Sequence, residues 1–407
     1  MSVTIGDIEA AAERIKGSVQ RTPCPASEPL SLATGCQIYC KLEHLQRTGS
    51  FKERGARNAL VRLPDDQKKK GVITASAGNH ALGLSYHGSL LKIPVTVVMP
   101  KVAPLTKITN CRNLGANVLL EGGNIEEAKQ FALKLGEEKG WYYINGYDHP
   151  DIIAGQGTMG LEILEQVPDV EAIIVPIGGA GLIAGIALAV KTRKPNVQII
   201  GVEPTRAASY AAAVQNGKPV LIQMQPTLAD GLAVPKVGDN AFEIARKYVD
   251  KVLAVGERDI ALAVLRLVEL EKAVVEGAGA TPLAVCLRHM VPELKGKKVV
   301  LPLCGGNIDT NILGRVIDRG LAADGRLCRF STVISDRPGG LSHFTALLAE
   351  EGASVHDIEH DRAFASEDIN TVTVHCVIET RDVEHIRRVR DRLQREGFQI
   401  SFPQWVL

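Results

Sequence analysis

Residues 172–190 read AIIVPIGGAGLIAGIALAV and contain no charged side chain. The stretch is nearly long enough to cross a membrane, but Pro176 and four glycines interrupt it. A strand ending at Ile177, a glycine turn and a buried helix ending near Val190 explain the pattern better. Strands that are apolar throughout are typical of parallel sheets whose two faces are both covered by helices.

Other short apolar runs alternate with helical stretches along most of the chain. The strands expected from these runs are Gly71–Ala75, Val95–Met99, Ala116–Leu120, Val197–Val202 and Lys298–Leu303. This alternation predicts an α/β fold with parallel sheets. Active sites of such folds gather at the carboxyl ends of the strands.

The composition narrows the class of protein. The chain has 47 Lys and Arg residues against 46 Asp and Glu residues, a net charge of +1 without long runs of one sign, so neither nucleic acid nor a membrane is an expected partner. Its 407 residues suffice for two or three domains. Residues 1–18 have a helical pattern with early acidic residues and no secretory signal, which predicts a cytoplasmic protein.

The eight cysteines are scattered rather than framed for disulfides, which favours a reducing compartment. Cys36, Cys40 and His44 are one candidate set of metal ligands. However, a strand over Gln37–Leu42 would keep the two cysteines on one face without bringing them together, so we expect no metal there.

The glycine turn indicates a phosphate site. Gly178, Gly179, Ala180, Gly181 and Leu182 join a strand to a helix, so their backbone amides can hold an anion at the helix N-terminus. The spacing also fits the dinucleotide pattern, with Glu203 about twenty residues further on. A nicotinamide-dependent dehydrogenase, or plain close packing of helix on strand, therefore remains open at this point.

Three further segments place chemically useful side chains at strand ends or helix starts. They are Leu45–Ala56 (LQRTGSFKERGA), Thr74–His80 (TASAGNH) and Pro302–Asn307 (PLCGGN). Together with the glycine turn, they resemble the fold-type II pyridoxal phosphate enzymes, with the motifs in the family's order over about residues 21–312. Within that family, the chain is similar to the threonine and serine dehydratases and to the serine racemases.

The resemblance implies a pyridoxal 5′-phosphate enzyme built from two parallel-sheet α/β subdomains, the smaller one inserted at about residues 70–148. Lys52 would form an imine with the cofactor and act as the base at Cα, and a lysine with a depressed pKa suits both tasks. Phe51 would pack against the ring, Asn79 would bond its phenolic oxygen, and residues 178–182 would hold its phosphate. Cys304 would face the pyridine nitrogen, where a thiol makes the ring a weaker electron sink than a carboxylate would.

The substrate implied is a small 3-hydroxy amino acid, L-threonine or L-serine, which would lose ammonia by β-elimination. The residues that would hold its carboxylate are Ser76, Ala77, Gly78, Asn79 and His80. For Asn79 and His80, plain helix capping is the alternative interpretation. Relatives that racemise carry a serine at the position of Ala77, which has no proton to give, so the chain departs from the racemase pattern.

A cation site is also implied, but in a weakened form. Related proteins bind a divalent cation through an acid matching Glu203, a carbonyl matching Ala207 and an acid where this chain has Ser209. With one carboxylate missing, a hard cation is held less strongly, and Glu203 as a plain acid at a strand end is the other interpretation.

The pattern changes after residue 322, where Ala322–Gly325 is expected to be a linker. This places a pyridoxal phosphate domain over residues 1–322 and a second domain over 326–407. The elements expected there are strand Phe330–Ser335, helix Leu341–Glu351, strand Ser354–His360, strand Thr371–Ile378, helix Val383–Arg395 and strand Gln399–Pro403. This βαββαβ order is ferredoxin-like.

The turn Asp336–Gly340 resembles that of ACT regulatory domains. The resemblance implies an amino-acid effector and a homodimer or homotetramer, whereas a dimerisation module without a ligand is the alternative. A third hypothesis for the whole chain is an amino-acid-binding regulator with an inactive catalytic part, but the set of Lys52, Asn79 and Cys304 argues against it.

Overall fold

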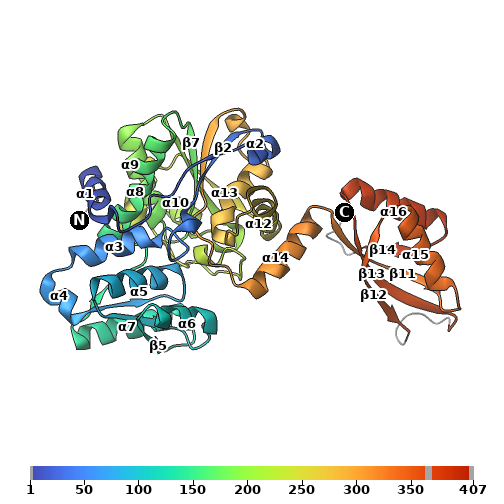
Figure 1. Ribbon diagram of the computed structural model, residues 1–407, viewed down its shortest axis with the longest axis horizontal. Helices are drawn as coiled ribbons and strands as arrows, with labels where there is room; N and C mark the ends of the chain where they lie inside the picture. The colour runs from blue at the N-terminus through green and yellow to red at the C-terminus, as the bar shows by residue number, and fades with distance from the viewer. Residues whose placement is uncertain (1–2, 363–368, 403–407) are drawn as a thin grey trace. The chain divides into compact units, whose positions relative to one another are not determined.

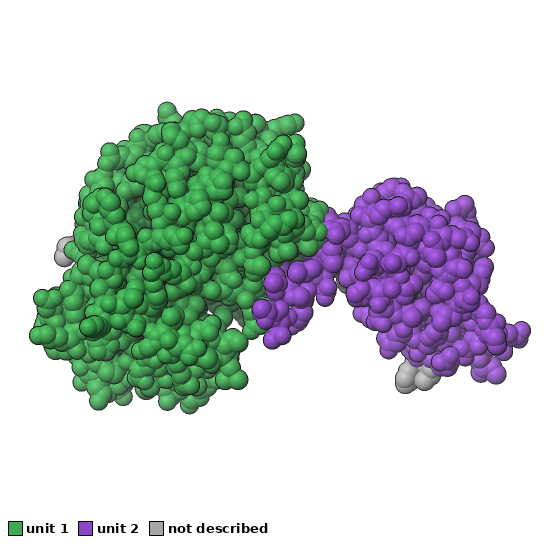
Figure 2. Space-filling view, in the orientation of Figure 1, with its two compact units in different colours: residues 1–309 green, residues 310–407 purple. Residues whose placement is uncertain are grey.

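The computed structural model describes residues 3–362 and 369–402. The chain forms two compact units, residues 1–309 and 310–407, which Figure 2 shows in different colours. Each unit has its own sheets and its own core, and the elements of each can be followed in Figure 1.

A six-stranded sheet forms the centre of the first unit. Its strands, in spatial order, are β1 (Ala26–Ser27), β2 (Gln37–Lys41), β10 (Lys298–Pro302), β7 (Ala172–Pro176), β8 (Gln198–Pro204) and β9 (Lys251–Val255). All neighbours are parallel except β1 and β2. Both faces are covered, because Ile173 and Val175 join the cluster around α9 (Gly181–Arg193) while Ile174 between them is equally buried.

A second, four-stranded sheet is fully parallel. Its order is β5 (Asn117–Leu120), β4 (Val95–Met99), β3 (Val72–Ala75) and β6 (Tyr142–Tyr143). The helices between its strands are α5 (Asn79–Leu91), α6 (Leu105–Asn113) and α7 (Ile125–Lys139). The expected α/β class with two parallel sheets is confirmed.

The remaining helices of the first unit complete the cores around these sheets (Figure 1). They are α1 (Ile5–Ile15), α2 (Glu28–Thr34), α3 (Lys52–Arg62), α4 (Asp65–Lys70), α8 (Pro150–Gln166), α10 (Ser209–Asn216), α11 (Asp239–Tyr248), α12 (Glu257–Glu271) and α13 (Gly277–Leu287), with short 3-10 turns at η1 (Glu43–Leu45), η2 (Thr205–Ala207), η3 (Asp230–Leu232) and η4 (Pro292–Leu294). Helices α8 and α9 can approach closely because Gly185 has no side chain. A Cβ there would lie 2.5 Å from the Ile153 oxygen.

The second unit has the ferredoxin-like order expected from the sequence. Helix α14 (Thr310–Ala323) leads into β11 (Leu327–Ser335), α15 (Gly340–Glu350), β12 (Ser354–Asp361), β13 (Thr371–Glu379), α16 (Val383–Arg395) and β14 (Ile400–Ser401). The sheet is antiparallel with the order β12-β13-β11-β14. Its core lies on one face: Phe330 and Ile334 of β11 are buried, whereas Val333 between them is 41% exposed.

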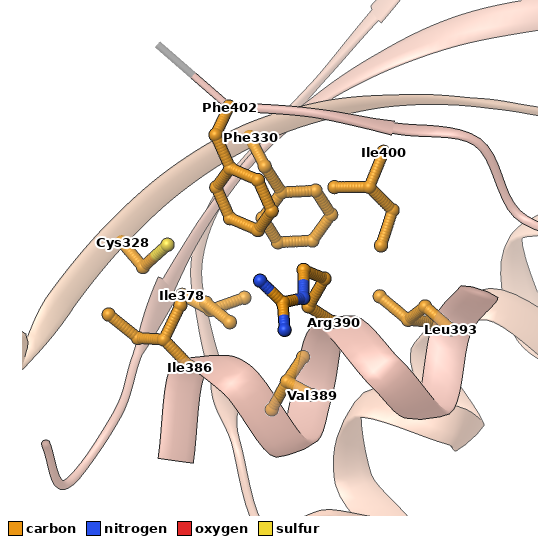
Figure 3. Close-up of a pocket in the computed structure, with 9 residues that line it drawn as sticks. All are labelled: Cys328, Phe330, Ile378, Ile386, Val389, Arg390, Leu393, Ile400 and Phe402. Atoms are coloured by element: carbon orange, nitrogen blue, oxygen red, sulfur yellow. The ribbon is translucent and has the colours of Figure 1, made fainter. Parts of the chain in front are cut away.

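A small cavity, too tight to admit a water molecule, remains in this core (Figure 3). The residues that line it are Cys328, Phe330, Ile378, Ile386, Val389, Arg390, Leu393, Ile400 and Phe402. Only Arg390 among them is charged, and its guanidinium lies 2.8 Å from the Asp391 carboxylate. The cavity is therefore an apolar packing gap beside one paired cation.

The sequence placed the linker at residues 322–325, but α14 continues through Ala323. Gly325, with φ +72°, ends the helix, and the Arg326 amide donates to the Leu321 oxygen. Because the contacts of α14 group it with the second unit, the boundary between compact units falls at residue 309, and the domain limits at 322 and 326 stay predictions. Pro403, the end of the last expected strand, lies outside the described residues.

No helix in the described part of the chain is long and apolar enough to cross a membrane. The eight cysteines all lie in that part and none is bonded in a disulfide. No three His, Cys, Asp or Glu side chains among residues 3–362 and 369–402 gather closely enough to hold a metal ion.

Candidate active site

A short backbone pairing places Lys52 at the carboxyl end of the large sheet. The Phe51 amide donates to the Cys304 oxygen at 3.0 Å, and the Gly306 amide donates to the Gly49 oxygen at 2.9 Å. Cys304 follows β10, so α3 begins where that strand ends. Gly49, with φ +74°, must be a glycine because a Cβ there would lie 2.4 Å from Asn307 Oδ1.

The surroundings of Lys52 favour a neutral amine. Its Nζ donates to the Gly146 oxygen at 2.7 Å and lies 5.1 Å from the centre of the Phe51 ring. Burial lowers the pKa of Lys52 to about 8, although the negative forms of Glu276 and Cys304 act to raise it. About a tenth of the amine is therefore unprotonated at pH 7, far more than for a free lysine, and only the unprotonated form is a nucleophile or base.

Asn79 belongs to a chain of amide and carboxylate groups. Its Nδ2 donates to Glu276 Oε1 at 2.8 Å, and its Oδ1 accepts from Asn307 Nδ2 at 2.9 Å. Asn307 Nδ2 also donates to the Thr48 oxygen at 2.7 Å. Residues far apart in the sequence are thus joined beside Lys52.

Helix capping is not what Asn79 and His80 do. The N-cap of α5 is Gly78, which has no side chain to cap the helix, and His80 Nε2 instead lies 3.2 Å from the Ile144 oxygen. Burial and the nearby Lys52 charge lower the pKa of His80 to about 3, so the ring is neutral. The Gly78 amide donates to Ser76 Oγ at 3.2 Å, which shapes the turn between β3 and α5, with Ala77 at its centre.

The glycine turn leaves its amides available. No hydrogen bond is donated by the amides of residues 178–182 among the described residues. Ala180 has φ +70°, so the turn is held in a conformation unusual for a residue with a side chain. Side chains at Gly179 and Gly181 are excluded by Tyr147, because a Cβ at either glycine would lie 2.2 Å from it. The turn and the start of α9, including Leu182 in its first turn, thus present free backbone donors of the kind that hold anions at helix N-termini.

Cys304 is a neutral thiol. Its Sγ donates to the Pro302 oxygen at 3.3 Å, and burial holds the pKa of the thiol well above its ordinary range. Cys304 and Glu276 both lie close enough to Lys52 for their charges to act on its pKa.

Glu203 and Ala207 lie at the end of β8 and in η2. The Glu203 carboxylate accepts from the amides of Tyr210 at 2.6 Å and Ala211 at 2.9 Å, so it already stabilises the start of α10. Burial raises its pKa to about 7. The cation site stays a prediction.

Sequence reasoning missed Glu276, Asn307 and Tyr147. Glu276 is the only charged residue in Ala273–Leu287, an otherwise uncharged run that opens a buried helix. Burying a lone acid in such a run costs free energy unless it has a hydrogen-bond or charge partner. The acid was therefore the available signal that Glu276 has a specific partner. Tyr147 offers no comparable signal, because its position depends on a contact with a turn over thirty residues away.

Comparison with known proteins adds to this geometry. The family described as pyridoxal-phosphate dependent enzyme matches residues 15–305. An L-threonine ammonia-lyase of Thermotoga maritima is 44% identical over 398 residues, which cover 98% of this chain and 99% of that protein. The processed form of threonine deaminase isoform 2 from Solanum lycopersicum has a TM-score of 0.74 at 37% identity, covering 77% of this chain and 92% of that one. Maize serine racemase has a TM-score of 0.74 at 35% identity, covering 79% of this chain and 98% of that one.

Proposed function

The chain belongs to the family of pyridoxal-phosphate dependent enzymes, and we propose that it is a lyase that deaminates L-threonine, and also L-serine, by β-elimination. Threonine would give 2-oxobutanoate and ammonia, and serine would give pyruvate and ammonia. The family match disfavours the nicotinamide cofactor that the glycine turn alone left open.

The residues present fit pyridoxal phosphate. The uncommitted amides of residues 178–182 suit its phosphate, and the amine of Lys52 suits its aldehyde. Asn79 keeps a second N–H beyond the one given to Glu276, which suits the phenolic oxygen. Phe51 and the neutral thiol of Cys304 would contact the ring and its nitrogen.

When bound, the cofactor withdraws electrons from the substrate Cα and makes its proton acidic. Lys52 takes that proton at Nζ, which is why a pKa near neutrality matters. Residues 76–80 hold the substrate carboxylate at the start of α5 and so orient Cα toward the amine. Ala77 offers no proton to the opposite side of Cα, which favours elimination over racemisation.

The observation that carries the proposal is the buried Lys52, whose pKa is lowered to about 8 and is acted on by Glu276 and Cys304, together with the uncommitted amides of the glycine turn. Its test is a panel of amino acids supplied to the purified holoenzyme, scored for 2-oxo acid and for the enantiomer of the remaining substrate. Threonine or serine should yield the 2-oxo acid and ammonia in equal amounts. Accumulation of D-serine without 2-oxo acid would overturn the assignment in favour of a racemase.

The second unit would be regulatory. We propose that a catalytic domain ending near residue 322 is followed by an ACT-type domain from about residue 326. An amino-acid effector would bind near the turn from Asp336 to Gly340. Gly339, with φ +96°, precedes α15 without a side-chain cap, and its amide donates no hydrogen bond among the described residues, whereas the amides of Asp336, Arg337 and Gly340 do. The apolar cavity of Figure 3 suits an amino acid less well, because its lining offers one cation and no acid.

A homodimer or homotetramer is proposed on the same resemblance, and a cytoplasmic location on the eight cysteines, none of which forms a disulfide. Sizing with light scattering, with and without aliphatic amino acids, tests the assembly. A strict monomer under all conditions would contradict it.

A further inference from the structure

Glu276 is a buried acid that the proposed reaction does not use. It is the N-cap residue of α13, and its amide donates to the Gly305 oxygen at 2.9 Å. Gly305 must be a glycine, because a Cβ there would lie 2.4 Å from Glu276 Oε1. The carboxylate is therefore wedged between the residues that follow β10 and the start of α5.

The hydrogen bonds around Glu276 have a fixed direction. The Thr48 oxygen is a carbonyl and can only accept, so it holds the Asn307 nitrogen. That nitrogen donates to Asn79 Oδ1, which turns the Asn79 nitrogen toward Glu276. An ionised carboxylate also accepts only, so both ends of the chain impose one orientation on the Asn79 amide.

We propose that Glu276 is a positioning residue whose carboxylate holds the Asn79 amide with its nitrogen toward the site, so that Asn79 offers an N–H to the phenolic oxygen of the bound cofactor. The inference rests on the proposed function, because it needs pyridoxal phosphate in the site. Protonation would make Glu276 a donor as well as an acceptor and would remove the constraint at its end of the chain, leaving only the hydrogen bond from Asn307.

The charge on Glu276 changes close to neutral pH. Burial raises its pKa to about 7, as does the charge of Asp230 on η3, while the Asn79 hydrogen bond and Lys107 on α6 act to lower it. Lys107 and Asp230 are themselves 3.1 Å apart. Lys52 on α3 and Cys304 after β10 are the other titratable groups that it acts on. The orientation of Asn79 is thus expected to weaken as the pH falls below neutrality.

The test follows the visible absorption of the bound cofactor across pH 5.5–9 in the parent, Glu276→Gln, Glu276→Asp, Asn79→Ala and the double variant. Glutamine imitates the protonated acid, so E276Q should lose the spectral change seen near neutral pH in the parent. It should also retain the cofactor about 10- to 100-fold less tightly, the range that a hydrogen bond to a charged group supports. E276D keeps the charge and should retain part of the change.

The double variant decides whether Glu276 acts through Asn79. With Asn79→Ala already present, E276Q should alter cofactor retention less than about twofold, since coupled residues are not additive. Equal effects of E276Q in both backgrounds, or a parent-like spectrum and pH dependence in E276Q, would overturn the proposal. If E276Q does not fold, an E276D spectrum and pH titration identical to those of the parent overturns it as well.

Glu257→Gln is the matched control. Glu257 also stands at a helix start and accepts from Thr227 Oγ1 at 2.6 Å and the Leu228 amide at 2.7 Å, so it reports the effect of losing such an acid elsewhere. Its cofactor spectrum should match that of the parent. A parent protein that binds no pyridoxal phosphate at all would refute the proposed function instead, before any variant is compared.

Discussion

The two units differ in how deeply their ion pairs are buried. In the first unit, the Arg54 guanidinium lies 2.7 Å from Glu43 and 2.7 Å from Glu162, and the side chains of Arg54 and Glu43 are fully buried. In the second unit, the Arg362–Asp336 pair at 3.0 Å has side chains that are 64% and 29% exposed. The difference follows from the sheets, because a parallel sheet covered on both faces buries its strand ends and an antiparallel sheet with one open face does not.

The consequence is that burial moves the pKa values of candidate site residues in the first unit, whereas in the second unit it raises those of the core thiols Cys328 and Cys376. Lys52, His80 and Glu276 have pKa values moved by burial toward about 8, 3 and 7. In the second unit, Asp336 has a pKa lowered mainly by its hydrogen bond from Arg362, an effect that solvent screens. Chemistry is therefore expected in the first unit and ligand-linked regulation in the second.

Lys52→Ala tests this division most directly. Removing the amine should reduce turnover by about 10⁴-fold, because the variant loses both the cofactor attachment and the base, while both units stay folded. Initial rates with threonine and circular dichroism measure the two effects. Lys134→Ala, at a lysine that is 78% exposed on α7, should behave as the parent. Threonine turnover near the parent rate in Lys52→Ala would place the chemistry elsewhere.

Arg54→Met removes a buried charge, and Arg362→Met removes an exposed one. The first substitution removes the buried guanidinium that pairs with Glu43, so the first unit should lose about 3–5 kcal/mol of unfolding free energy. Arg362→Met in the second unit should change the free energy of unfolding far less, because solvent screens the exposed pair. Denaturant unfolding followed separately for each unit gives both values. Similar losses for the two variants would remove the contrast.

Stopping the chain at residue 322 removes the antiparallel sheet of the second unit entirely. Turnover of threonine should remain, because the residues assigned to catalysis lie before residue 308, but the response to an effector should vanish. An effector coupling of about 5- to 150-fold is typical of allosteric proteins, and isoleucine and valine are the first ligands to try. If the shortened chain responds as the full chain does, or no amino acid affects either, the second unit is not regulatory.

The smallest expected effect is the pH dependence of cofactor attachment to Lys52. The pKa of Lys52 is lowered from 10.5 to about 8, so its neutral fraction grows as the pH rises and levels off above 8. The rate at which the cofactor-free protein regains its visible band should therefore rise about fivefold between pH 7 and pH 8 and little beyond pH 9. Glu276→Gln should move this curve to lower pH, because an ionised Glu276 raises the pKa of Lys52. A curve rising up to pH 10.5 would show an unperturbed lysine.

A substitution at Cys304 tests whether this residue of the first unit faces the ring nitrogen of the cofactor. Replacement by aspartate would place a carboxylate where burial already opposes a thiolate, next to Glu276. Side reactions such as transamination should rise relative to elimination if the residue faces the ring nitrogen. Product ratios measured at equal cofactor content check this, and unchanged ratios would show that the residue faces something else.

The sequence by itself determined the strands, the ferredoxin-like order and the segments around Lys52, Asn79, Cys304 and the glycine turn, because apolar periodicity and turn residues are local properties. It misplaced the end of α14, since nothing local distinguishes a helix that ends at Ala323 from a linker that begins at Ala322. Only the tertiary structure joined Asn79 to Glu276 and Asn307, and only burial moved the pKa of Lys52 to about 8. Hydrogen-bond partners and desolvation depend on contacts between distant segments, which no local pattern records.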